Sequence, residues 1–143
     1  MVKNKYCLLG MLLVMMLLTL MLTSCEKSEF GVTENSAKLM TITAEKADKS
    51  ASVLAGTLEV ADGEQIVITA NLTKGSVKVE IIGVPAEQNI DELPEIDGEA
   101  VITANLKSTD SASDTVPAGS YQVRAACLET ATGTVQIEVK PAE

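Results

Sequence analysis

Apolar and polar residues alternate along most of the chain after residue 39, and this pattern predicts β-strands. The alternating runs are rich in Val, Ile and Thr, and Gly, Asp and Pro separate them. We expect seven strands, over residues 40–44, 54–60, 65–72, 76–84, 100–106, 120–128 and 134–140. Every second residue of each strand is apolar, so one face of each strand is expected to point into a core.

The same alternation predicts which side chains form that core. They are Met40, Ile42, Ala44, Leu54, Leu58, Val60, Ile66, Ile68, Ala70, Leu72, Val77, Val79, Ile81, Ala100, Ile102, Ala104, Leu106, Tyr121, Val123, Ala125, Cys127, Val135, Ile137 and Val139. Apart from Tyr121 these residues carry no ring, so the core is expected to be aliphatic.

One apolar face per strand is typical of antiparallel sheets that are covered on one side only. The sequence therefore predicts an all-β fold, an antiparallel β-sandwich of about seven strands with an immunoglobulin-like or jelly-roll-like arrangement. A small β-barrel is the alternative. Asp62-Gly63 predicts a hairpin turn, and Gly75 and Gly133 are expected at left-handed positions in two further tight connections.

A short internal repeat lies within the predicted strands. The segment 62–72 recurs as 97–106, nearly identical after one residue of the first copy is deleted. One interpretation is structural, with two strands in equivalent positions that each follow an Asp-Gly turn. The other is functional, with Asn71 and Asn105 forming a paired polar face.

The N-terminal segment follows a different pattern. Lys3 and Lys5 precede a nearly unbroken apolar run from Cys7 to Leu22. This run is shorter than the ~20 residues of a membrane-spanning helix and is typical of a secretory signal sequence. The residues that follow, Leu22-Thr23-Ser24-Cys25, resemble the lipobox of bacterial lipoproteins.

The resemblance covers residues 1–25 and implies a processing pathway. It implies a signal peptide over 1–24, cleavage between Ser24 and Cys25, and a diacylglycerol thioether on Cys25. An acyl chain such as palmitate would be added to the new amino terminus. Residues 25–38 would then be the lipidated cysteine and a flexible tether, and 39–143 the β-sandwich domain. An uncleaved anchor and plain secretion are the alternatives.

Charge changes the picture of the part after Cys25. The 143-residue chain has a net charge of −9, but all 20 carboxylates and only nine of the 11 basic residues follow Ser24, which gives this part a net charge of −11. Nucleic-acid binding requires a basic face, so the charge argues against it. The positive mean hydropathy of +0.22 owes much to the apolar leader.

Candidate catalytic chemistry is sparse. The sequence has no histidine, which excludes Ser-His-Asp and Cys-His catalysis and disfavours zinc. Cys127 has no partner in the mature chain and lies on an apolar strand face, so we expect a buried structural thiol. We therefore expect no enzyme activity, no metal site and no cofactor apart from the covalent lipid.

An acidic segment is the candidate for a cation or partner site. Its carboxylates are Asp91, Glu92, Glu95, Asp97 and Glu99. Carboxylates can bind Ca²⁺, but this segment lacks the Asp-x-Asp-x-Asp-Gly spacing of a calcium loop. An exposed loop between strands is the favoured interpretation.

Together these features predict a lipoprotein that is anchored to the cell membrane outside the cytoplasm, in the outer membrane if the host has two. The domain would be a non-catalytic binding or envelope-associated module with a protein or envelope-polymer ligand. The alternative is an accessory or inhibitor-like domain that acts on a secreted enzyme through loops 85–99 and 107–118. A hydrolase is the third possibility.

Overall fold

The computed structural model describes residues 28–85 and 95–143, so the predicted signal peptide and lipobox lie outside the described residues. Nine strands form this part of the chain: β1 (Glu29–Asn35), β2 (Leu39–Ala47), β3 (Ser52–Val60), β4 (Glu64–Lys74), β5 (Ser76–Gly83), β6 (Ile102–Lys107), β7 (Ser111–Thr115), β8 (Gly119–Cys127) and β9 (Ala131–Pro141). Within the described ranges no helix has the length and apolar character needed to cross a membrane.

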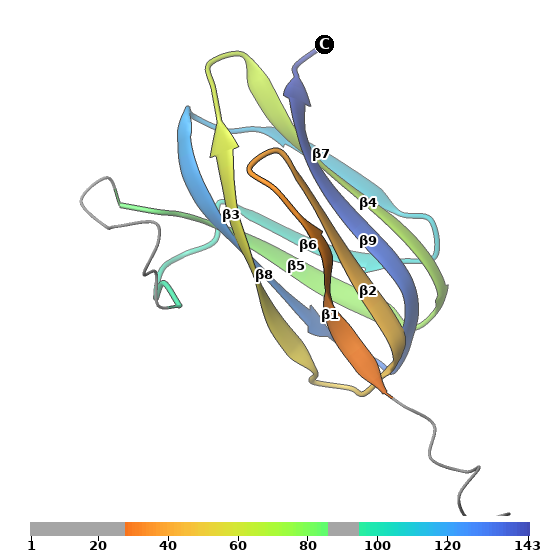
Figure 1. Cartoon of the computed structure of the whole chain (residues 1–143). Coiled ribbons are helices and arrows are strands. Elements are labelled where there is room, and N and C mark those ends of the chain that lie inside the picture. Colours follow the sequence, from red (N-terminus) through yellow and green to blue (C-terminus); the bar gives the residue numbers. More distant parts are fainter. Residues whose placement is uncertain (1–27, 86–94) are drawn as a thin grey trace, which may run out of the picture.

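The strands form two antiparallel sheets packed face to face (Figure 1). The five-stranded sheet has the order β1-β2-β9-β4-β7, and the four-stranded sheet has the order β3-β8-β5-β6. The eight strands from β2 to β9 have the winding of a jelly roll, and β1 is added at one edge. The predicted antiparallel β-sandwich is confirmed, in its jelly-roll form.

Most connections pass from one sheet to the other. Among consecutive strands only β1 with β2 and β5 with β6 pair directly. The turn at Asp62-Gly63 joins β3 to β4 in the opposite sheet, so the predicted hairpin is wrong, although Gly63 has a left-handed φ of 79°. Gly75 (φ 77°) is the expected tight connection, between β4 and β5, whereas Gly133 lies inside β9.

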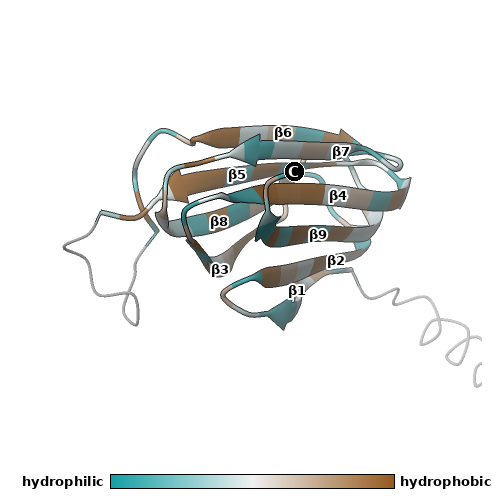
Figure 2. Cartoon of the chain, turned by 90° about the horizontal axis from the view of Figure 1, so that it is seen from above, coloured by the Kyte–Doolittle hydropathy of each residue, from teal (hydrophilic) through white to brown (hydrophobic). Residues whose placement is uncertain are grey.

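The core lies between the sheets and is almost wholly aliphatic. Its largest fully buried side chains include Met40, Ile42, Leu58, Ile66 and Ile137. Tyr121 is the one ring among the buried residues of the described part, and its hydroxyl donates a hydrogen bond to the carbonyl oxygen of Pro117. Figure 2 shows the apolar stretches on strands of both layers. The alternation thus predicted the core correctly in nearly every strand.

Two strands were not predicted, and both lie at the edges of the five-stranded sheet. β1 occupies residues that were expected to belong to the flexible tether over 25–38, and β7 lies within the expected loop 107–118. β1 pairs only with β2 and β7 only with β4. Residues 29–35, which were expected to belong to the tether, therefore form a strand of the sandwich.

The internal repeat corresponds to β4 and β6, which belong to different sheets. Ala70 and Leu72 in β4, like Ala104 and Leu106 in β6, are buried in the common core, as the structural interpretation requires. The polar residues between them point outward on opposite faces of the sandwich. Asn71 and Asn105 therefore do not form a paired polar face.

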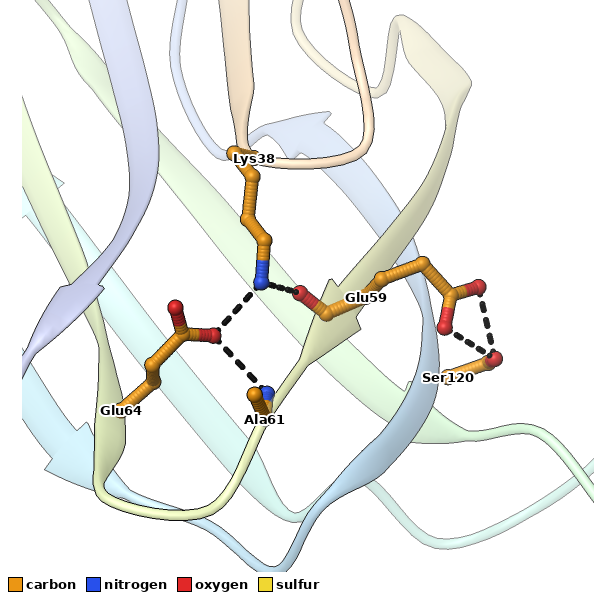
Figure 3. A network of polar contacts seen from close by, with 5 residues as sticks. All are labelled: Lys38, Glu59, Ala61, Glu64 and Ser120. Atoms are coloured by element: carbon orange, nitrogen blue, oxygen red, sulfur yellow. Dashed lines mark hydrogen bonds and ion pairs between the residues drawn. The ribbon is translucent and has the colours of Figure 1, made fainter.

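A polar network ties the two sheets together at one end of the sandwich (Figure 3). Lys38 Nζ, from the β1–β2 turn, contacts Glu64 Oε2 at 2.6 Å and donates to the carbonyl oxygen of Glu59 at 2.8 Å. Glu64 also accepts the Ala61 backbone N–H at 2.8 Å, and Ser120 Oγ donates to the Glu59 carboxylate at 2.7 Å. These contacts fix the connection between β3 and β4.

Candidate functional site: an arginine-centred depression

A depression of about 170 Å³ lies on the outer face of the four-stranded sheet. Its lining comes from β3, β5, β8 and the segment that follows residue 94. The lining residues are Ser52, Val53, Leu54, Lys78, Glu80, Glu95, Arg124, Ala125 and Ala126. The small side chains of Ser52 and Ala126, which are register partners, leave room beside the larger charged groups.

Arg124 is at the centre of this depression and is the only arginine in the sequence. The strand register explains its neighbours, because Arg124 in β8 lies opposite Leu54 of β3 on one side and Glu80 of β5 on the other. Sheet pairing thus places one cation between an apolar and an acidic side chain. Along the chain these three residues are far apart.

The guanidinium is only partly satisfied by its neighbours. Arg124 Nη1 donates to Glu95 Oε1 at 2.8 Å, and Arg124 Nη2 lies 4.0 Å from Glu80 Oε2. Arg124 Nε is buried and has no hydrogen-bond partner among the described residues. An arginine carries five N–H donors, and a buried donor without a partner costs free energy. The site therefore has unused hydrogen-bonding capacity on its cation.

A second cation lies beside this group. Lys78 Nζ is 3.5 Å from Glu80 Oε1, so Glu80 is close to both Lys78 and Arg124. The Glu80 side chain is 28% exposed, whereas that of Glu95 is 68% exposed. Glu80 is thus held within the sheet, and Glu95 approaches Arg124 from outside it.

A β-bulge places Leu54 in the depression. The register between β3 and β8 shifts between Leu54 and Gly56, which leaves Ala55 as the extra residue. Ala55 is buried while Leu54 is 44% exposed, so the prediction that Leu54 points into the core is wrong. A bulge reverses the alternation at the point where it occurs. Asn35 Nδ2 donates to the carbonyl oxygen of Ala55 at 3.2 Å and supports this conformation.

The segment that carries Glu95 is attached to the outer face of the sheet. Gln122 is a buried polar residue on that outer face, and its Oε1 accepts the backbone N–H of Ile96 at 2.8 Å. Ile82 and Ile96 are both buried. Gly98 lies beside both side chains, and a Cβ atom added to it would lie 3.4 Å from Ile82 Cγ2. This small apolar contact fixes the position of the backbone next to Glu95.

The predicted acidic site is only partly described. Asp91 and Glu92 lie outside the described residues, while Asp97 and Glu99 are exposed in the segment after Glu95. Glu95 forms an ion pair with Arg124. Within the described ranges no three His, Cys, Asp or Glu side chains come together in a way that would hold a metal ion.

The two loops that were expected to act together are described only in part, because residues 86–94 lie outside the described residues. Residues 116–118 lie at the same end of the sandwich as the β5–β6 connection, since Gly83 pairs with Tyr121. Residues 108–110 connect β6 to β7 at the opposite end. The expected loop 107–118 thus contains β7, and its two ends lie at opposite ends of the sandwich.

Of the cysteines singled out in the sequence, the structure describes Cys127 but not Cys25. Cys127 is a buried free cysteine, as expected, and burial raises the pKa of its thiol, with a smaller contribution from the Asp48 carboxylate. A raised pKa keeps the thiol protonated and unreactive. Ser24 and Cys25, the predicted cleavage and lipidation residues, lie outside the described part of the chain.

Comparisons with known proteins give no family. No family model matches the sequence, and no curated protein matches it. Among solved structures, PirA has a TM-score of 0.47 at 9% identity, covering 76% of this chain and 98% of PirA. KdgF from Halomonas sp. has a TM-score of 0.36 at 14% identity, with 82% and 88% coverage. A structure described as CBM4 has 0.37 at 12% identity, with 80% and 79% coverage. These similarities are too low to indicate a ligand or an activity.

Proposed function

We propose that the chain is a lipid-anchored, non-catalytic binding module that recognises its ligand on the outer face of the four-stranded sheet. The observation that carries this proposal is the arginine-centred depression, where Arg124 retains donors that no described residue uses. A buried donor without a partner, such as Arg124 Nε, calls for an explanation. Binding sites commonly combine a few polar groups with apolar side chains, as Arg124 and the exposed Leu54 do here.

The lipid anchor rests on the resemblance of Leu22-Thr23-Ser24-Cys25 to a lipobox. If Cys25 carries lipid, only residues 26–28 separate it from β1, which begins at Glu29. Such a short link spans roughly 10–14 Å at full extension. The domain would therefore be held close to the bilayer surface by the end at which β1 starts, while its C-terminus lies at the other end (Figure 1).

Replacement of the lipidated cysteine tests the anchor. We expect Cys25→Ala to abolish incorporation of labelled palmitate, because the thioether needs the Cys25 sulfur. The variant also lacks the acyl chains that would hold a processed protein firmly on the membrane. Metabolic labelling in the native host measures the first effect, and fractionation of the processed chain measures the second.

Cys7→Ala is the matched control, since it removes a thiol from the predicted leader without touching the lipobox. It should be labelled and retained like the wild type. If Cys25→Ala is processed and fractionates like the wild type, the lipoprotein assignment is wrong.

A further inference from the structure

We propose that the depression binds a carboxylate-bearing ligand, whose carboxylate takes the place of Glu95 on the Arg124 guanidinium. This inference rests on the proposed function, because it names the chemical class that the binding face recognises. The two charged groups of this ion pair, Arg124 and Glu95, differ in how firmly the fold holds them.

The backbone of Arg124 is fixed by strand pairing on both sides. It lies in β8, which pairs with β3 and β5 on its two sides, and its side chain is only 24% exposed. Glu95 approaches from the segment beside the sheet and is 68% exposed. The cation is thus part of the sheet, whereas the anion that neutralises it is the one partner that can leave without disturbing a strand.

Displacement of Glu95 changes the charge of the depression. With Glu95 in place, two cations, Lys78 and Arg124, face two carboxylates, Glu80 and Glu95. Without it the remaining groups have one excess positive charge. Because salt screening is weak over distances of a few ångströms, that excess favours a single negative charge over a neutral ligand. A single carboxylate would neutralise this excess, whereas a phosphate dianion would leave the depression with a net negative charge.

The geometry of the contact also favours a carboxylate. Glu95 reaches Arg124 through one oxygen, Oε1, and contacts only Nη1 at hydrogen-bond distance. A free carboxylate has two oxygens that match the planar fork of a guanidinium, and paired contacts of this kind are stronger than single ones. A ligand that is not attached to the chain can adopt the two-oxygen arrangement that Glu95 does not adopt.

The surroundings set the size of the group that can follow the carboxylate. The depression has a volume of about 170 Å³, which suits one sugar-acid ring or one acidic side chain. Leu54, 44% exposed, supplies an apolar wall, and Ser52 on the same strand supplies a hydroxyl. Both a sugar acid and an acidic amino acid have this chemistry, so the test includes a probe for each.

The single arginine gives a direct readout. The full chain, labelled with ¹⁵N and purified in detergent, has one arginine Nε–Hε signal because Arg124 is the only arginine. We expect glucuronate or N-acetylglutamate to shift this signal in a saturable way in the millimolar range. Their uncharged counterparts, glucose and N-acetylglutamine, should not shift it at the same ionic strength. Glucuronate alone would indicate a sugar acid, and N-acetylglutamate alone an acidic amino acid.

Two matched variants test the role of Glu95. Glu95→Gln removes the competing carboxylate and should tighten binding of the active probe severalfold. Glu99→Gln removes the same charge from an exposed position in the same segment and should leave the affinity unchanged. Arg124→Gln should abolish binding, as followed by the backbone amide signals of Ser52 and Ala126, while the remaining spectrum shows that the domain is folded.

The inference is overturned if neither carboxylate shifts the Arg124 signal, if the neutral probes shift it equally, or if Glu95→Gln binds no tighter than Glu99→Gln. Equal shifts by neutral probes would retain the binding face and remove the carboxylate preference. Membrane fractionation of the Cys25 variant is an independent measurement, so failure of the anchor and failure of the carboxylate site can be told apart.

Discussion

Residue 75 is a glycine because the chain has no room there for any other side chain. Gly75 forms the whole connection between β4 and β5 and has a left-handed φ of 77°. A Cβ atom at this position would collide with the carbonyl oxygen of Thr130 and approach the Cα atom of Ala131. Both neighbours are backbone atoms, which cannot turn away as a flexible side chain can.

Gly75→Ala should therefore lower the free energy of unfolding by more than about 2 kcal/mol, the sum of a left-handed conformation and a backbone clash. Urea unfolding followed by circular dichroism measures the loss. Gly31→Ala is the control, since Gly31 has no left-handed φ and no atom near its Cβ position, and it should change stability by less than about 0.5 kcal/mol. Equal losses in the two variants would contradict the steric explanation.

Glu64 gives the domain a pH-dependent contact. Its hydrogen bond with Lys38, followed by the one from the Ala61 backbone N–H, lowers the pKa of its carboxyl below the ordinary value of 4.5. A carboxyl whose pKa is lowered by folding contributes stability above its unfolded pKa, and this contribution is lost as the pH falls through the folded value.

We expect Glu64→Gln to lower the urea midpoint at pH 7 and to lower it less near pH 3, because protonation of the wild-type carboxyl at low pH removes the contribution that the variant lacks. Glu138→Gln, at an exposed position on β9, is the control for a general loss of negative charge. A difference between the Glu64 variant and the wild type that has the same size at both pH values would argue against the Lys38 contact as its source.

The residues around the depression include some whose positions the sequence pattern did not predict. Strict alternation places Leu54 in the core with Leu58, but the bulge at Ala55 reverses the direction of every residue before it in β3. Gly56, which has a φ of 144°, lies at the bulge, and a glycine inside a strand pattern is a local signal for one. The Asn35 contact that supports the bulge comes from another strand, and the local sequence carries no signal for that contact. The surroundings of Arg124 could not be predicted from the sequence either, because Leu54 and Glu80 become its neighbours only through strand pairing.

At the scale of strands, the sequence predicts those that bury apolar residues and misses those that do not. β4 has the burial alternation of a central strand, whereas β7, with the sequence Ser-Ala-Ser-Asp-Thr, buries none of its five residues fully. β1 is likewise an edge strand without a fully buried residue. Edge strands owe their conformation to one neighbour, and that neighbour is distant in sequence for β7.

This difference predicts the order of local opening. Amides of β1 and β7 should exchange with deuterium faster than those of β9, which has partners on both sides, because local opening of an edge strand breaks fewer contacts. Hydrogen–deuterium exchange with peptide-level mass spectrometry measures it, with β9 as the internal reference. Protection of β7 equal to that of β9 would show that the edge is held by contacts other than the β4 ladder.

For the whole molecule, β9 is the strand that joins the five-stranded sheet. It lies between β2 and β4, and without it the sheet consists of two separate pairs, β1 with β2 and β4 with β7. It also contributes Val135, Ile137 and Val139 to the core.

A chain that ends after Thr130 should therefore lack the native fold, with loss of the strand signal in far-ultraviolet circular dichroism and rapid proteolysis. A chain that ends after Pro141 retains all of β9 and should resist proteolysis like the full chain. If the shorter chain remained protease-resistant, the four-stranded sheet would be stable without its partner sheet.

The central place of the last strand has a consequence for how the protein is made. Synthesis proceeds from the N-terminus, so β2 and β4 leave the ribosome long before β9, the strand that both must pair with. Neither can complete its pairing until β9 is available, and folds built on such distant pairings form slowly. The five-stranded sheet therefore cannot be completed while the segments before β9 are being synthesised.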